Sequence, residues 1–152
     1  MPLVISQPGA EGRHSRALAS SIDLGPTLLD LCDLPGYDGM RGVSLQPVLE
    51  DSNQVVRDGV LIEDDIAAIT AKLTPIPGKT RTLVTERYRY TRNSKGEEQL
   101  FDLQADPDEM LDISSSADAV RARMLEHLVD ALIDADDVAR GAPVTQNIGE
   151  LG

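Results

Sequence analysis

The chain has 152 residues, of which 41% are hydrophobic and 26% are charged, a composition typical of a folded globular protein. Its 26 acidic and 14 basic side chains give a formal net charge of −12, which disfavours nucleic-acid phosphates and anionic lipid surfaces as partners. Cys32 is the only cysteine, so an internal disulfide and a cysteine-based metal cluster are excluded.

No apolar run approaches the roughly 20 residues of a membrane-spanning helix, so we expect no membrane partner. No basic region followed by an apolar stretch opens the chain, as it would in a signal peptide. A fragment would have lost such a segment with the part that precedes it. The sequence therefore leaves the compartment open between cytoplasm and periplasm.

The first third of the chain predicts one strand and one helix. Residues 2–6 form a short apolar run typical of a strand buried on both faces. Asp23 is a plausible N-cap of a helix, with Pro26 in its first turn, where a missing N–H costs nothing. The predicted apolar face of this helix consists of Leu24, Leu28, Leu31 and Cys32. Residues 37–56 read as a loop, with one short helical turn at 44–49.

The rest of the chain predicts an antiparallel sheet closed by a helix. Strands are expected at residues 59–63, 82–85, 87–92 and 99–103, with an irregular loop at 64–80 and turn residues at 93–96. Alternation places Tyr88 and Tyr90 on one face, and Arg87 and Arg89 on the other. The closing helix runs from about residue 117 to 136. Its apolar stripe consists of Val120, Met124, Leu128, Leu132 and Ala135.

Five segments, in the same order, resemble those of the sulfatase family. They are Pro2-Leu3-Val4-Ile5-Ser6-Gln7-Pro8-Gly9, Ser20-Ser21-Ile22-Asp23-Leu24-Gly25-Pro26-Thr27-Leu28-Leu29-Asp30-Leu31, Gly39-Met40-Arg41-Gly42-Val43-Ser44-Leu45, Arg81-Thr82 with Arg87-Tyr88-Arg89-Tyr90, and Leu100-Phe101-Asp102-Leu103 followed by Asp106-Pro107 and Glu109. The likeness extends from residue 2 to about residue 135. One departure is Asp112, where the family usually has Asn, and we expect it to affect only a turn.

The resemblance implies an α+β chain that forms the C-terminal part of an alkaline-phosphatase-like α/β sulfatase fold. Residues 1–55 would be the end of the α/β domain, residues 56–140 a subdomain with about four antiparallel strands and a closing helix, and residues 141–152 a flexible tail. The family hydrolyses sulfate esters with a formylglycine beside a divalent metal, usually calcium. The partner implied is therefore a missing N-terminal catalytic domain that carries both groups.

The residues that could carry chemistry do not match the family's catalytic pattern. The nucleophile lies in Cys/Ser-x-Pro-x-Arg, whereas Cys32 is followed by Pro35 one place too late and by Gly36 where Arg is required. An arginine beside the nucleophile holds the charge that develops on the sulfate, so its absence is a chemical objection too. We interpret Cys32 as a small apolar residue on the buried side of its helix.

The acidic and histidine side chains give no stronger candidate. Asp64 and Asp65 follow a predicted strand and are interpreted as part of a solvated loop or a pocket rim rather than as metal ligands. The acidic stretch at 102–113 fails as a calcium-binding EF-hand loop, because its sixth position is Pro107. His14 has no companion ligand, and His127 is interpreted as a structural helix residue. The chain itself is therefore expected to bind no metal or cofactor.

A basic face of Arg87, Arg89 and Arg92 could suggest nucleic-acid binding, but the bulk charge opposes it. The leading hypothesis is a C-terminal segment of a sulfatase that completes the fold, shapes the substrate pocket and is inactive alone. The alternatives are the same segment of a phosphonate monoester or phosphodiester hydrolase, and a free-standing interaction module. Without its partner domain, the apolar strand at residues 3–6 is expected to promote self-association.

Overall fold

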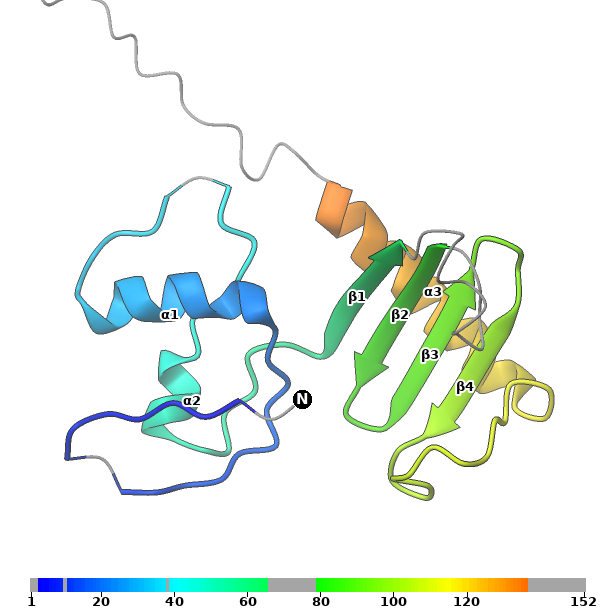
Figure 1. Cartoon of the computed structure of the whole chain (residues 1–152), viewed down its shortest axis with the longest axis horizontal. Helices are drawn as coiled ribbons and strands as arrows, with labels where there is room; N and C mark the ends of the chain where they lie inside the picture. Colours follow the sequence, from blue (N-terminus) through cyan, green and yellow to red (C-terminus); the bar gives the residue numbers. More distant parts are fainter. Residues whose placement is uncertain (1–2, 10, 38, 66–78, 137–152) are drawn as a thin grey trace, which may run out of the picture.

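The computed structural model describes residues 3–9, 11–37, 39–65 and 79–136 (Figure 1). The elements, in chain order, are the 3₁₀ turn η1 (Ser21–Asp23), α1 (Leu24–Leu31), α2 (Gln46–Glu50), β1 (Gly59–Asp65), β2 (Lys79–Thr85), β3 (Tyr88–Asn93), β4 (Glu98–Asp102) and α3 (Asp118–Asp136). No helix within these ranges is both long enough and apolar enough to cross a bilayer.

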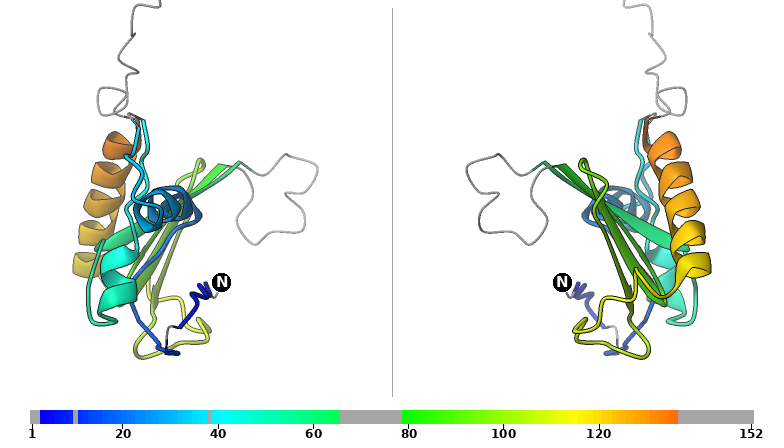
Figure 2. Two further views of the ribbon diagram at one scale, coloured as in Figure 1. Left: turned by 90° about the vertical axis from the view of Figure 1, so that its left-hand side faces the viewer. Right: turned by 90° about the vertical axis from the view of Figure 1, so that its right-hand side faces the viewer.

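The four strands form one antiparallel sheet in the order β1-β2-β3-β4, and α3 lies across one of its faces (Figure 2). The predicted α+β class, with four strands and a closing helix, is confirmed. One cross-strand row, in register, supplies the centre of the core: Leu61, Leu83, Tyr90 and Leu100. Met124 and Leu128 of α3 are buried against this row, as the apolar stripe predicted.

Local sequence explains why the sheet is antiparallel. The turn between β3 and β4 contains Gly96 at φ +84°, a backbone conformation that favours glycine. The side-chain oxygen of Asn93 accepts hydrogen bonds from the backbone N–H groups of Lys95 and Glu97, at 2.9 Å each. These bonds fix a tight connection, so β4 returns directly beside β3.

The outer edge of β4 is occupied by the segment that leads to α3. Ile113 donates its backbone N–H to the carbonyl of Leu100 at 2.9 Å. The carboxylate of Asp112 accepts from the backbone N–H groups of Leu100 at 3.0 Å and Ser114 at 2.9 Å. The expectation that Asp112 affects only a turn is therefore wrong, because this side chain also binds the edge of the sheet.

Two other expectations are corrected by the structure. Residues 3–9 contain no strand, because no described segment lies beside them to supply the backbone partners that a strand needs. The connection between the first two strands is shorter than expected, because Asp64 and Asp65 belong to β1 and Lys79 begins β2. The remainder of the predicted loop, residues 66–78, and the predicted tail at 141–152 lie outside the described residues.

The part of the chain before β1 is organised around α1. This helix begins after Asp23 with Pro26 in its first turn, as predicted, and α2 forms at the predicted helical turn. The buried side of α1 differs from the prediction: Thr27 is buried, while Leu24, Leu28, Leu31 and Cys32 are all exposed. The apolar face of α1 therefore has no partner within the described residues.

Candidate functional site

The two predicted pocket-rim residues lie at the end of β1, on opposite faces of the sheet. Asp65 forms ion pairs with Lys79 at 3.3 Å and with Arg81 at 2.9 Å. The hydrogen bond from Arg81 and the charge of Lys79 lower the pKa of Asp65. Asp64 is exposed and faces the other side, since neighbouring strand residues alternate. The two carboxylates therefore do not converge on one ligand.

The remaining candidates from the sequence are also separated. His14 and Cys32 are both exposed, which corrects the expectation that Cys32 is buried. The acidic stretch after β4 binds its own surroundings: Asp102 pairs with Arg87, and Asp106 accepts a hydrogen bond from the backbone N–H of Leu111. Within the described ranges, no group of three His, Cys, Asp or Glu side chains could hold a metal ion.

The arginines of β3 do not form the continuous basic face that the sequence suggested. Arg89 stacks on Phe101, with its guanidinium carbon 5.1 Å from the ring centre, and it pairs with Glu109. Arg92 lies on the face of Tyr90, where it pairs with Glu98 at 2.8 Å. Each of these two guanidinium groups is therefore neutralised by a carboxylate of the same chain.

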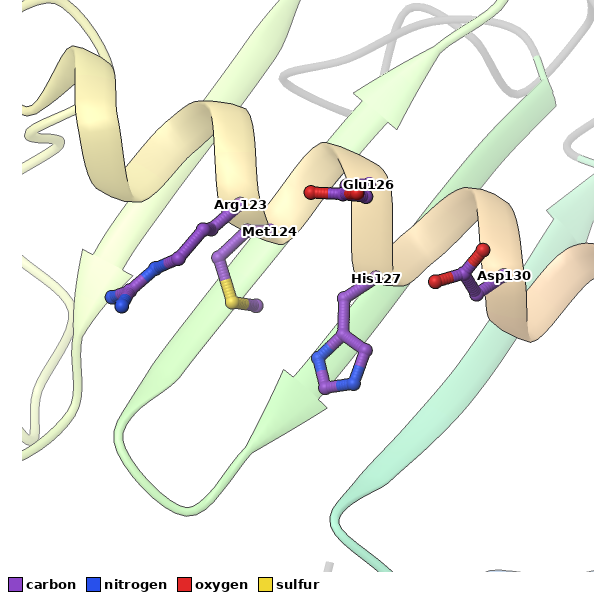
Figure 3. Close-up of a pocket in the computed structure, with 5 residues that line it drawn as sticks. All are labelled: Arg123, Met124, Glu126, His127 and Asp130. Atoms are coloured by element: carbon purple, nitrogen blue, oxygen red, sulfur yellow. The ribbon is translucent and has the colours of Figure 1, made fainter.

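Along α3, five side chains line an open hollow of about 390 Å³: Arg123, Met124, Glu126, His127 and Asp130 (Figure 3). His127 also lies 3.5 Å from the carboxylate of Asp58, in the segment before β1. A histidine beside a carboxylate could act as a base, but no Ser, Cys, Thr or Tyr lines this hollow to act as a nucleophile. The contact instead joins α3 to the start of the sheet.

Among the described residues, the most completely buried acidic side chain is that of Asp23, which stands at the predicted N-cap position of α1 but makes no capping hydrogen bond to that helix. Its carboxylate accepts hydrogen bonds from the backbone N–H of Ser20 at 2.7 Å and of Val43 at 2.9 Å, and it pairs with Arg57. Asp23 is fully buried, and the side chain of Arg57 is only 15% exposed. One carboxylate therefore joins η1, the segment after α1 and the entry to the sheet.

Two neighbours of Asp23 complete this buried junction. The Thr27 hydroxyl donates to the backbone carbonyl of Asp23 at 2.6 Å and accepts from the backbone N–H of Leu45 at 2.9 Å. Gly42 lies against η1, and a Cβ atom there would be only 2.0 Å from the carbonyl oxygen of Ile22. The segments around Asp23 and Gly42 are therefore complementary parts of one structural site.

A second polar cluster lies beside the core under α3. Glu98 accepts hydrogen bonds from the Tyr90 hydroxyl at 2.6 Å, from Arg92 at 2.8 Å and from Arg121 at 2.9 Å. These bonds, that of Tyr90 foremost, lower the pKa of Glu98. Burial, reinforced by the bond to Glu98, raises the pKa of Tyr90 to about 12. Tyr90 is thus held as a neutral hydrogen-bond donor, which is a structural role.

Comparison with known proteins gives matches along most of the chain. Residues 1–135 match the family model described as N-sulphoglucosamine sulphohydrolase, C-terminal. Arylsulfatase K of Gallus gallus is 33% identical over 125 residues, which cover 75% of this chain and 22% of that protein. The chain therefore spans less than a quarter of the length of this relative.

Two solved structures show the same arrangement. A 2-O GAG sulfatase has a TM-score of 0.63 and 25% identity, over 78% of this chain and 25% of that one. The phosphonate monoester hydrolase of Agrobacterium radiobacter has a TM-score of 0.63 and 26% identity, over 77% of this chain and 25% of that one. In both, the matched part is a minor portion of a longer protein.

Proposed function

This chain belongs to the sulfatase family, whose C-terminal domain it matches, and we propose that it completes the fold of a sulfate ester hydrolase and is not catalytic alone. The proposal includes the missing N-terminal catalytic domain as partner. It also divides the chain into residues 1–55, at the end of the α/β domain, and residues 56–140, the sheet subdomain. Residues 141–152 would be a tail.

The exposed apolar face of α1 is the observation that carries this proposal. Leu24, Leu28 and Leu31 lie at i, i+4 and i+7, so their side chains form one stripe. Leu28 is 63% exposed, while the polar Thr27 on the inner side is buried. A helix with its leucines outward and its threonine inward is placed to receive an apolar surface from another part of a larger protein.

The chemistry that the family uses would come from that larger part. A formylglycine would supply the nucleophile, and calcium would neutralise the sulfate oxygens. The residues of this chain do not fit either group: Cys32 lacks the required Arg, and the described carboxylates form no three-ligand set. Asp23, the one fully buried carboxylate in the part of the chain that the structure describes, already accepts from three donors of this chain.

The test compares the isolated chain with the intact protein that contains it. We expect the intact protein to hydrolyse an aryl sulfate in the presence of calcium and the isolated 152-residue chain to show no turnover. A chelator should abolish the activity of the intact protein. Turnover by the isolated chain, reproducible after repurification, would contradict the proposal, and so would an intact protein without Cys/Ser-x-Pro-x-Arg before this segment.

The phosphonate monoester hydrolase match supports a second candidate function. Its identity to this chain, 26%, is close to the 25% of the GAG sulfatase, so this domain does not discriminate between the two substrate classes. The discriminating measurement is the ratio of kcat/KM for an aryl sulfate and for an aryl phosphonate on the intact protein. A ratio above one supports the sulfatase, and a ratio below one supports the alternative.

For the pocket rim, the proposal assigns different roles to Asp64 and Asp65. Asp64 is exposed and carries no ion pair among those described, so it would be the residue that meets a substrate. Asp65 is held by Lys79 and Arg81 and would instead fix the end of β1. In the intact protein, Asp64→Asn should change KM and leave the unfolding temperature constant, whereas Asp65→Asn should lower that temperature. Unchanged KM for Asp64→Asn would remove it from the rim.

A further inference from the structure

The sheet has a second face, opposite α3, with an unusual composition for a chain so rich in charge. Two rows in register form its centre. The first row is Val60, Val84, Arg89 and Phe101, and the second is Ile62, Thr82, Thr91 and Gln99. Arg89 is the only charged side chain in these two rows, and it is paired with Glu109 and stacked on Phe101.

The face toward α3 shows the opposite distribution. Next to the apolar core row lies a row made entirely of charged residues: Glu63, Arg81, Arg92 and Glu98. A sheet with one face packed on a helix normally places its charged residues on the other, solvated face. Here a complete row of charges borders the helix, whereas the two central rows of the other face contain a single charge, the paired Arg89, with Asp64 beside them at the end of β1. This reversal indicates that the second face is an interface.

We propose that this second face, around Ile62 and Thr82, docks on an uncharged surface of the catalytic part of the same polypeptide. The inference rests on the proposed function and adds to it a second contact surface, separate from the stripe on α1. Ile62 is 48% exposed, so the face is open at β1, the edge strand.

The position of the chain's first residues supports this occupant. The N-terminal segment lies on the side of the sheet away from α3, in both views of Figure 2. A polypeptide leading into residue 3 would therefore approach on this side. The relative from Gallus gallus is more than four times as long as its matched part, which provides ample surface to cover the face.

Thiol accessibility tests the proposal without depending on stability. Ile62→Cys and the matched control Val129→Cys are made in a Cys32→Ser background, in both the isolated chain and the intact protein. Val129 is 46% exposed, like Ile62, but lies on α3. Maleimide labelling is followed by mass spectrometry at each position. We expect labelling at position 62 to be about tenfold or more slower in the intact protein, because a buried thiol reacts only after local opening. Labelling at position 129 should differ by less than about twofold between the two proteins.

Each other outcome overturns a specific part of the argument. Equal labelling at position 62 in the two proteins, with aryl sulfate hydrolysis retained, overturns the docking face and leaves the proposed function intact. Slow labelling at position 62 in the isolated chain also overturns the docking face, because the isolated chain then covers this face itself. If dilution restores fast labelling, a second copy of the chain is what covers it. An intact protein that hydrolyses neither sulfate nor phosphonate esters overturns the proposed function instead.

Discussion

Replacing Asp23 by alanine removes the carboxylate that receives two backbone N–H groups and the guanidinium of Arg57. Asp23 is fully buried, so no water replaces the lost acceptor, and Arg57 is left as a nearly buried charge without its partner. Breaking a buried ion pair in this way costs about 3–5 kcal/mol. That is a large share of the roughly 5–15 kcal/mol that stabilises a typical protein.

The assay is urea-induced unfolding of the 152-residue chain, followed by circular dichroism, together with hydrogen exchange at the amide of Val43. Asp23→Ala should lower the free energy of unfolding by about 3–5 kcal/mol and accelerate hydrogen exchange at the amide of Val43. Asp23→Asn keeps an oxygen acceptor but loses the charge, so it should lower the free energy of unfolding by a smaller amount than Asp23→Ala. Asp30→Ala, on the exposed side of α1, is the control. A loss for Asp23→Ala within about 1 kcal/mol of that control would refute the reasoning.

Three further outcomes follow from features described above. Gly42→Ala should unfold the part of the chain before β1, because its Cβ would overlap the backbone carbonyl of Ile22 in η1. The control Gly12→Ala meets no atom within 4 Å and should keep the wild-type melting temperature. Burial raises the pKa of Tyr90 to about 12, above its value in the unfolded chain, so the folded state is favoured below pH 10 and loses this contribution as the pH rises from 10 to 12. Tyr90→Phe should therefore flatten the curve of unfolding free energy against pH in that window. Leu28→Ser should reduce binding of a hydrophobic dye and self-association of the isolated chain in sedimentation, and the equally exposed Leu111→Ser should change both less, because Leu111 lies outside the stripe on α1.

The sheet and its helix were predictable because their signals are local. Strand alternation, the turn at residues 93–96 and the stripe of α3 each lie within one element or between adjacent ones, so period and turn chemistry suffice. The same reasoning correctly placed Tyr88 and Tyr90 on one face of β3 and Arg89 on the other. It wrongly placed Arg92 on the face of Arg89. The two residues are three positions apart in β3, so alternation puts Arg92 on the opposite face, together with Tyr90.

The junction around Asp23 could not be predicted from patterns of this kind. Asp23 and Arg57 are 34 positions apart, and no periodicity relates them. The prediction of the buried side of α1 was wrong. An apolar stripe indicates which face of a helix packs against another surface, but it does not indicate whether that surface belongs to the same chain. One signal was present in the sequence: Gly42 and Asp23 both lie in segments that resemble the same family, so a contact between them was a natural hypothesis.

The edges of the sheet determine how this domain would behave once cut from its protein. An open edge strand is a template for pairing with another chain, and natural proteins block it with charge or with a covering segment. Both devices are present here, since β1 ends in Glu63, Asp64 and Asp65, and the segment at Asp112 and Ile113 occupies the side of β4. The two edges of the sheet are therefore protected against pairing with another chain, and we expect aggregation of the isolated chain to proceed through the leucines of α1. A shortened protein that begins just before β1 would be the tractable form for crystallisation or NMR.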